Sequence, residues 1–501
     1  MYSTKTILLL PIKKTKTNTN KMSTSTFTKT NYGSLATITT VFFFWGFVAA
    51  SNDILIPVFK EHLHLEQWQS QLISFAFYIA YTVGSILYYM ISYFTKKDII
   101  NRIGYKNGVS LGLLISAAGT LLFIPAANYE SFYTMITGLF IVGIGFSLQQ
   151  TAANPLAINL GDPAKGSQRL SLAGGINNLG TTIGPVLLGL AIFGGVNNDA
   201  KNVSIDSIKI PYLLLGLAFV LVAILFKFSS IPNKPAVIED EVIEDKSAKK
   251  SALAYPQLIL GMIAIFLYVG VEVSTAGNLS DYLKQNVGIE TRKAAPFISL
   301  FWASLMIGRW TSAAGAFNMK KSTQTLLSVL LPFVAFGIFM GINSLVGNDV
   351  SMFNYYPLVI VVMILGDFMS KGNPAKQLLI FSLLGILSLF IGMNTSGMVS
   401  VYAFISVGLF CSTLWPCIFT LSISGLGKYT NQGSGFLIMM IMGGGIVSLV
   451  QGRLAGNDLL GIQASYIVGV ICFAYLAFFA VYVRNLLKKQ GVELEAPAAG
   501  H

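Results

Sequence analysis

The sequence predicts an all-α membrane protein that crosses the bilayer many times, and two observations carry this prediction. Of the 501 residues, 54% are apolar and only 11% are charged, whereas a soluble globular domain carries roughly 25% charged residues. Long apolar runs, such as residues 35–58 and 132–158, also approach or exceed the roughly 20 residues that a helix needs to cross a bilayer core. A chain with this distribution cannot place all of its surface in water.

The formal net charge of +12 raises the question of a nucleic-acid partner. The Lys and Arg residues form no dense basic face; they lie mostly in short links between apolar runs, where they encode orientation in a membrane. We therefore expect the lipid bilayer as a partner and no nucleic acid. Cys411, Cys417 and Cys472 all lie in apolar segments and are interpreted as small hydrophobic residues, not as a disulfide or a metal site.

The first half begins with residues 1–34, a Lys-, Thr-, Ser- and Asn-rich stretch that we interpret as a disordered cytoplasmic tail, with Met22 as an alternative start. Residues 35–228 are predicted to form a helix bundle. Its six apolar segments lie at about 35–58, 68–92, 107–127, 131–158, 170–195 and 210–228. Residues 229–252 follow, with two prolines and an acidic cluster, and are too polar to cross a bilayer. They are predicted to be a cytoplasmic linker between two halves.

The second half, residues 253–484, is predicted to be a second bundle with eight apolar segments, followed by a cytoplasmic tail at 485–501. The segments lie at about 254–280, 293–315, 325–343, 355–370, 376–394, 398–424, 433–456 and 461–483. Six segments before the linker and eight after it give about fourteen transmembrane helices.

The positions of Lys and Arg predict that both termini are cytoplasmic. The links assigned to the cytoplasm contain Lys96, Lys97, Arg102, Lys106, Lys165, Arg169, Lys320, Lys321, Lys371, Lys376 and Lys428. Three opposite links, at 343–354, 395–397 and 456–461, contain no Lys or Arg, and cytoplasmic links are the ones that accumulate these residues. The exceptions are Lys60, Lys201, Lys209, Lys284, Arg292, Lys293 and, near the outer end of its span, Arg453.

The two halves also share a loose pattern. Asn154-Pro155 and Gly166-Ser167 in the first half correspond to Trp415-Pro416 and Gly433-Ser434 in the second. Repeated halves joined by a cytoplasmic linker are typical of alternating-access carriers. Chance similarity between apolar helices is the alternative.

Carboxylates inside apolar segments are candidates for ion coupling, because an Asp at a helix centre costs roughly 2.5–3.5 kcal/mol on insertion scales. Asp53 lies beside Asn52 in an apolar helix, and the alternative is an interfacial position near Pro57. Glu272 lies deep in its segment, with Asn278 among small and polar residues after it; the alternative is a structural hydrogen bond. Asp281 and Asp367 lie near segment ends and are expected to be solvated.

Amides form a second group of candidates. The group consists of Gln149, Gln150, Asn154, Asn177 and Asn178. Gln150 and Asn154 are four residues apart and share a helix face, and Asn177 on the next segment is expected to meet them across the bundle. Amides donate and accept hydrogen bonds, as sugar hydroxyls do. Structural bonds between helices are the alternative.

Aromatic residues inside the segments complete a predicted sugar site, because rings stack on the apolar face of a pyranose. They are Trp45, Tyr78, Tyr81, Tyr268, Trp302 and Trp415. Any one of them is more often an interfacial anchor than a ligand. The three histidines lie in a link and at the end of the chain, and the sequence contains no G-x-x-x-x-G-K loop. We therefore expect no enzyme, no cofactor and no ATP-driven transport.

Several short runs along the chain form a specific pattern: Asn52-Asp53-Ile54-Leu55-Ile56-Pro57, Thr151-Ala152-Ala153-Asn154-Pro155, Gly308-Arg309, Pro416-Cys417-Ile418-Phe419-Thr420-Leu421, Gly425-Leu426-Gly427, Gly433-Ser434-Gly435 and Gly443-Gly444-Gly445. In these runs the sequence resembles the fucose–proton symporter family of the major facilitator superfamily, and the resemblance covers most of residues 35–483. Gln150 and the run Tyr268-Val269-Gly270-Val271-Glu272-Val273 look most like its glucose/galactose transporter branch.

This resemblance implies two six-helix bundles around a central sugar site, and uptake coupled to a proton or a sodium ion. It implies a coupling role for Asp53 and a sugar contact for Asn177. Gln150 stands where fucose members have a glutamate, and Gly174 stands where a glutamine is often found. Two apolar segments at about 325–370 are additional to the twelve-span pattern.

The prediction is therefore a monomeric hexose carrier of a bacterial inner membrane, importing glucose and/or galactose by cation symport. The predicted coupling residues are Asp53 and Glu272, and the predicted sugar-binding residues are Asn52, Gln150, Asn154, Asn177, Tyr268, Asn278, Trp302 and Trp415. The alternatives are another sugar, such as fucose or N-acetylglucosamine, and a sugar sensor that does not transport.

Overall fold

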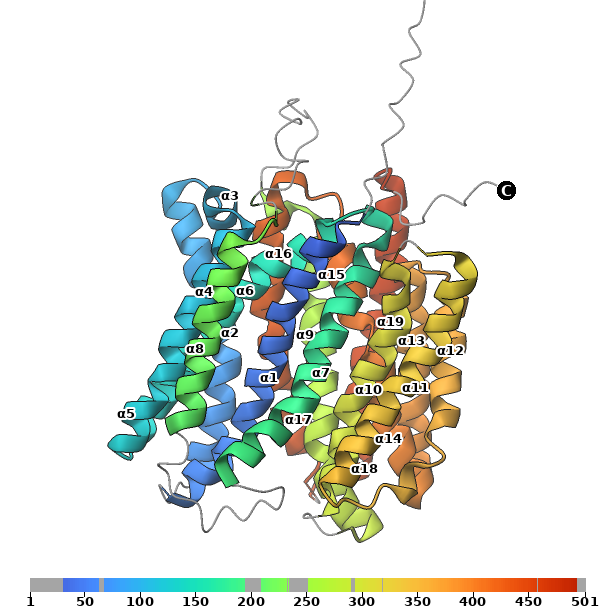
Figure 1. Ribbon diagram of the computed structural model, residues 1–501. Helices are drawn as coiled ribbons and strands as arrows, with labels where there is room; N and C mark the ends of the chain where they lie inside the picture. The colour runs from blue at the N-terminus through green and yellow to red at the C-terminus, as the bar shows by residue number, and fades with distance from the viewer. Residues whose placement is uncertain are drawn as a thin grey trace, which may run out of the picture.

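The computed structural model describes residues 30–62, 67–193, 209–231, 233, 251–289, 293–317, 319–456 and 458–492. Helices run roughly side by side through its full height (Figure 1), and the described residues contain no strand. The first half contains α1 (Tyr32–His62), α2 (Gln67–Thr95), α3 (Ile99–Ile103), α4 (Tyr105–Leu121), α5 (Phe123–Asn128), α6 (Phe132–Asn159), α7 (Gly166–Phe193) and α8 (Lys209–Phe228). The second contains α9 (Pro256–Tyr282), α10 (Ala295–Ala313), α11 (Lys321–Leu345), α12 (Pro357–Ser370), α13 (Pro374–Asn394), α14 (Gly397–Cys411), α15 (Leu414–Ile423), α16 (Thr430–Met439), α17 (Gly443–Leu454), α18 (Gly461–Ala464) and α19 (Ile467–Lys489).

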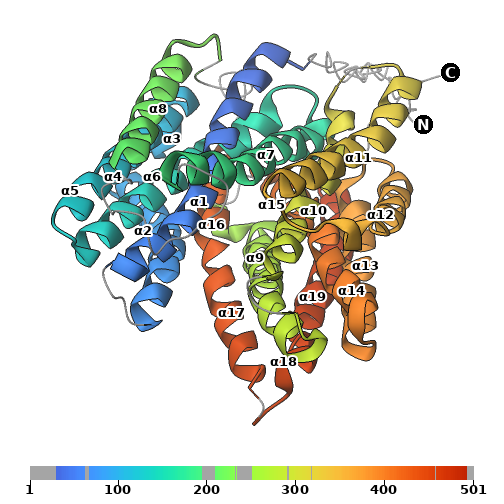
Figure 2. The same ribbon diagram turned by 60° about the horizontal axis from the view of Figure 1, so that its bottom comes forward.

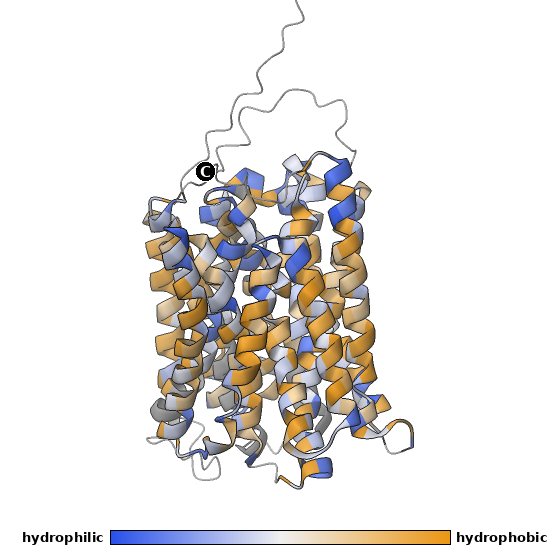
Figure 3. Ribbon diagram, turned by 90° about the vertical axis from the view of Figure 1, so that its right-hand side faces the viewer, coloured by the Kyte–Doolittle hydropathy of each residue, from blue (hydrophilic) through white to orange (hydrophobic). Residues whose placement is uncertain are grey.

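The helices have the length and hydropathy of membrane spans. Within the described residues, eleven helical stretches are long and apolar enough to cross a bilayer, and Tyr32–Val48 is a shorter apolar helix. Hydrophobic residues dominate the middle of the molecule, and hydrophilic residues gather toward its two ends (Figure 3). Every apolar segment predicted from the sequence coincides with a helix or with two consecutive helices. The prediction of a many-span all-α membrane protein is confirmed.

The two halves pack in the same pattern. In the first half, α1 packs on α7, and α4 packs on α6 and α8; in the second, α9 packs on α17, and α13 packs on α14 and α19. The halves meet through α7 against α10 and through α2 against α16 (Figure 2). Two further helices of the second half are α11 and α12. They pack on α10 and α13 at the periphery of the second half.

Glycine permits the closest helix contacts within each half. A Cβ atom on Gly46 of α1 would lie 1.9 Å from the Asn177 carbonyl oxygen of α7, and one on Gly443 of α17 would lie 2.0 Å from the Phe266 carbonyl oxygen of α9. Both distances are far below van der Waals contact, so only a residue without a side chain fits there. The two corresponding helix pairs therefore use the same device, as small residues commonly do between membrane helices.

Hydrogen bonds bridge the two halves at the end of the molecule where α3 and α16 lie, the upper end in Figure 1. Asn431 of α16 accepts a bond from the Tyr105 hydroxyl (2.6 Å) and donates one to Asn101 Oδ1 (2.6 Å). Ser434 Oγ donates to the Thr151 carbonyl oxygen of α6 (2.9 Å). These bonds hold α16 of the second half against α3, α4 and α6 of the first.

Two details differ from the sequence prediction. Arg169, which was assigned to a link, lies in the first turn of α7 and is fully buried. Its guanidinium donates to the carbonyl oxygens of Ala157 and Ile158, which end α6 and have no partner inside that helix. Helix α19 continues to Lys489, beyond the bundle boundary predicted at 484. Most of the predicted linker and tails lies outside the described residues.

Candidate substrate cavity

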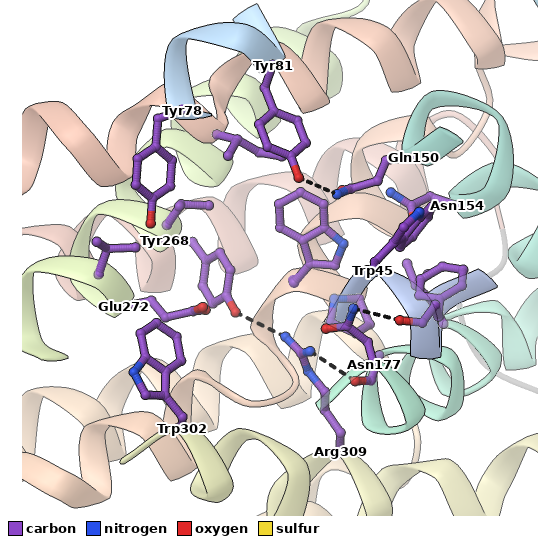
Figure 4. A pocket seen from close by; sticks show the side chains of 18 of the residues that line it. Trp45, Tyr78, Tyr81, Gln150, Asn154, Asn177, Tyr268, Glu272, Trp302 and Arg309 are labelled. Carbon is purple, nitrogen blue, oxygen red and sulfur yellow. Dashed lines mark hydrogen bonds between the residues drawn. The ribbon is translucent and has the colours of Figure 1, made fainter. Parts of the chain in front are cut away.

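A cavity of about 260 Å³ lies between the two halves, with walls from both (Figure 4). This volume is just below the roughly 300–1,000 Å³ of pockets that hold drug-sized ligands, so the cavity suits a small solute. The first half contributes Phe42, Trp45, Phe77, Tyr78, Tyr81, Gln150, Asn154, Leu170, Gly174 and Asn177. The second contributes Tyr268, Val269, Glu272, Val273, Trp302, Arg309, Trp415, Pro416 and Ile441.

The wall from the first half presents three neutral amides. Gln150 Nε2 donates to the Tyr81 hydroxyl (3.1 Å), and Asn177 Nδ2 donates to the Phe42 carbonyl oxygen (2.8 Å). Asn154 is almost fully buried, and its Nδ2 has no hydrogen-bond partner. A buried donor without a partner is costly. This amide is therefore available to a polar ligand in the cavity.

Gln149, one residue before Gln150, forms structural hydrogen bonds between helices, which was the alternative to sugar binding for the amides. It is fully buried. Its Oε1 accepts a bond from the Trp45 indole, and its Nε2 donates to Ser116 Oγ (2.9 Å). The two neighbouring glutamines point in different directions from α6, and only Gln150 lines the cavity.

The wall from the second half presents aromatic rings and two charged groups. The rings of Tyr268 and Trp415 lie 6.1 Å apart at 54°, and Trp302 lies beside Glu272 (Figure 4). Glu272 and Tyr268 are four residues apart on α9, so they share a face. Glu272 Oε2 is buried and has no hydrogen-bond partner. Such an oxygen is stable only if a proton, a cation or a polar ligand meets it.

Arg309 of α10 is the second charged group, and a break in the neighbouring helix helps to place it. Pro416 lacks an N–H group, so it cannot bond the Ser412 carbonyl oxygen four residues earlier. This oxygen lies between α14 and α15 and accepts a bond from Arg309 Nε (2.8 Å). Arg309 Nη2 points toward the Tyr268 hydroxyl (3.5 Å; Figure 4). The arginine thus connects the helix break to the residue beside Glu272.

Arg309 also reaches across to the first half. Its Nη1 donates to Asn178 Oδ1 (2.5 Å) and to the Gly174 carbonyl oxygen (3.3 Å), both on α7. A Cβ atom on Gly174 would lie 3.1 Å from Nη1 and 3.2 Å from Arg309 Cδ, tighter than most real contacts. The glycine therefore leaves the space that the arginine occupies.

Seven of the predicted site residues meet at this cavity: Gln150, Asn154, Asn177, Tyr268, Glu272, Trp302 and Trp415. Asn278 is not part of the lining, and its amide donates to the Ser274 carbonyl oxygen of its own helix (2.8 Å). The predicted site residues Asn52 and Asp53 lie outside the residues whose side chains the structure describes. Arg309 was missed, although an arginine in the middle of an apolar segment is as unusual as a carboxylate there.

In the part of the chain that the structure describes, no group of three or more His, Cys, Asp and Glu residues could hold a metal ion. The three cysteines are buried, as their positions in apolar segments predicted. The cavity chemistry therefore consists of neutral amides, aromatic rings, one carboxylate and one guanidinium.

Comparisons with known proteins agree with this architecture. The sequence profile of the Major Facilitator Superfamily matches residues 36–373. The chain is 34% identical over 465 residues to the glucose/galactose transporter of Brucella abortus biovar 1 (strain 9-941), covering 92% of this chain and 97% of that one. It is 27% identical over 466 residues to the L-fucose-proton symporter of Escherichia coli K12, covering 89% and 92%.

A solved structure is similar over nearly the same length. The crystal structure of a variant of the Escherichia coli fucose:proton symporter matches with a TM-score of 0.68 at 25% identity, covering 90% of this chain and 98% of that one. The chain therefore belongs to the Major Facilitator Superfamily, in the family that contains the glucose/galactose transporters and the L-fucose–proton symporters.

Proposed function

We propose that this protein imports a neutral hexose, glucose and/or galactose, by cation symport through alternating access. The observation that carries the proposal is the cavity between the two halves, where three neutral amides face aromatic rings. Amides pair with hydroxyls in both directions, and rings cover the apolar face of a sugar. The name of the Brucella relative supports the same substrates.

Uptake by purified protein in liposomes tests this function. Labelled glucose should exchange for unlabelled glucose inside the vesicles, and both glucose and galactose should compete. If fucose or N-acetylglucosamine competes more strongly than either hexose, the proposed substrate is wrong and the proposed transport function stands. A sugar sensor would bind the label without exchanging it.

We propose that Glu272 or Asp53 carries the coupling ion. The support is the buried Glu272 Oε2, which has no partner and can take a proton or coordinate a sodium ion. Neutralising a carboxylate lowers the cost of enclosing it away from water, so ion binding would permit the occluded state to form.

Two measurements identify the coupling ion and test Asp53 as the coupling residue. Uptake driven by a pH gradient in choline buffer indicates a proton, and uptake that requires sodium indicates sodium. Electrogenic sugar uptake that survives in Asp53→Asn would remove Asp53 from the coupling mechanism.

We propose that the chain crosses a bacterial inner membrane fourteen times as a monomer, with both termini in the cytoplasm. The support is the matching packing of six helices in each half, which leaves α11 and α12 as an added pair. An even number of added spans preserves the orientation of all later helices. A reporter fused to each terminus tests this, and opposite locations for the two reporters would contradict it.

A further inference from the structure

The added pair of helices contains a charged group that the transport mechanism above does not use. Asp367 is half-buried on α12, within the candidate span Ser351–Ser370. A carboxylate in a span is costly and is usually found with a partner and a function. The partner of Asp367 is Gln377 of α13, whose Nε2 donates to Asp367 Oδ1 (2.7 Å).

Gln377 continues the connection toward the cavity. Its side chain is almost fully buried, and its Oε1 accepts a bond from the Cys417 thiol (3.6 Å). Because one end of the amide is held by the carboxylate, its other end must present the oxygen to α15. The three residues thus link α12, α13 and α15 in one series.

Cys417 immediately follows Pro416 and Trp415, which line the cavity. Helix α15 has only ten residues and is separated from α14 by the break at Ser412 and Thr413. A helix that is not continuous with its neighbour depends on side contacts for its orientation. Arg309, which lines the cavity, bonds the break at Ser412, and the Gln377 amide bonds Cys417 in the first turn of α15.

The added pair is also fixed to the bundle at its other end. The Tyr356 hydroxyl, just before α12, bonds Ser304 Oγ of α10 (2.7 Å), and Asn343 Nδ2 of α11 donates to Ser299 Oγ of α10 (3.2 Å). The pair is therefore a firm part of the second bundle and can support α15.

We propose that Asp367 is a positioning residue for the cavity: through Gln377 and Cys417 it orients α15, and with it Trp415, against the substrate. The substrate part of this inference rests on the proposed hexose transport. Asp367 acts here as a hydrogen-bond acceptor, so its charge is not required.

The test uses full-length protein in liposomes with three variants. Asp367→Leu removes the acceptor, Gln377→Glu keeps the shape but replaces the donor by a second acceptor, and Asp367→Asn keeps an acceptor oxygen. Asp349→Asn, in the exposed link of the same pair, is the matched control because its carboxylate bonds only the nearby Ser351, through its side chain and its N–H, among the contacts described.

Two readouts are measured on each variant: the KM and kcat of glucose uptake, and the rate at which a membrane-permeant maleimide labels Cys417. Peptide mass spectrometry separates Cys417 from Cys411 and Cys472, which serve as internal controls for general loosening. Asp367→Leu and Gln377→Glu should raise KM about three- to tenfold with kcat within about twofold, the effect of losing roughly one hydrogen bond. Labelling of Cys417 should rise selectively, and Asp367→Asn should resemble the wild type.

Unchanged KM and unchanged Cys417 labelling in Asp367→Leu would overturn the proposal, as would Asp367→Asn behaving like Asp367→Leu. Gln377→Glu supplies the same test if Asp367→Leu does not fold. Faster labelling of all three cysteines would show general destabilisation instead of positioning, and would also overturn it. Should the wild type transport no hexose, the labelling still decides whether the series holds α15.

Discussion

The two walls of the cavity come from halves with the same packing but carry different chemistry. The first half presents neutral amides, of which Asn154 has a free donor. The second half presents Glu272 and Arg309, and both halves contribute aromatic rings. The shared packing is set by the glycine contacts and apolar faces, which do not constrain the few side chains that point inward. A common fold therefore leaves each half free to carry its own chemistry, with the amides in the first half and the charged groups in the second.

The largest effect is expected from removing the charge of Glu272. In Glu272→Gln, the amide cannot take a proton or hold a cation as a carboxylate does, so concentrative uptake should fall to simple equilibration. Sugar counterflow should continue, because the amides of the first half are intact. Asp281→Asn, on the exposed end of α9, is the control. Sugar accumulation that persists in Glu272→Gln would show that Glu272 does not carry the coupling ion, and would contradict the assignment of ion coupling to the second half.

Arg309→Ala should reduce the initial rate of uptake by about ten- to a hundredfold. The change leaves the Ser412 carbonyl oxygen and Asn178 Oδ1 unpaired, and a buried acceptor left without a partner costs about 1–3 kcal/mol. Arg309→Lys keeps the charge but not the planar fork, so it should recover only part of the rate. Uptake rates and the thermal midpoint are measured together. A full rescue by lysine would show that charge alone matters.

Asn154→Ala should raise the KM for glucose about five- to thirtyfold with little change in kcat, since one or two ligand hydrogen bonds are worth about 1–2 kcal/mol. Gln149→Leu is the contrasting variant, because Gln149 bonds Ser116 and the Trp45 indole and does not line the cavity itself. It should lower the thermal midpoint and raise KM less than Asn154→Ala does, because it touches the cavity only through Trp45. A KM effect in Gln149→Leu together with a stability effect in Asn154→Ala would contradict the assignment of Asn154 to ligand binding and of Gln149 to helix packing.

Ser434→Ala should have the smallest effect, a two- to fivefold change in kcat, because a neutral hydrogen bond contributes about 1 kcal/mol. The lost bond to the Thr151 carbonyl oxygen joins the two halves, and neither Ser434 nor Thr151 lines the cavity. Sugar preference should therefore stay constant across a panel of hexoses. A changed preference would mean that contacts between the halves, and not the walls alone, select the sugar.

The sequence predicts the helices well because membrane spans are defined by local composition. It also identifies most of the cavity, since polar groups inside apolar segments are few and each requires a reason. Arg309 is not among the predicted site residues, because only carboxylates suggest ion coupling from the sequence. The Ser412 carbonyl oxygen that binds it is left without a helical partner by Pro416, and its position beside Arg309 is visible only in the structure.

Side-chain direction is the other limit of sequence reasoning. Gln149 and Gln150 have the same chemistry and adjacent positions, yet only one faces the cavity. Asn278 follows Glu272 on α9 but turns its amide to its own backbone. Periodicity groups residues on a helix face, but the direction in which that face points depends on the partners that pack around it.

The bonds that join α16 to α3, α4 and α6 are made by amides, hydroxyls and a backbone carbonyl, and none of them involves a charged group. Dissolved salt screens interactions between exposed charges over a Debye length of about 8–10 Å, but it has little effect on neutral hydrogen bonds. The closure of this end should therefore be insensitive to ionic strength. A carrier closed in this way would keep the balance between its conformations while the salt content of its surroundings changes.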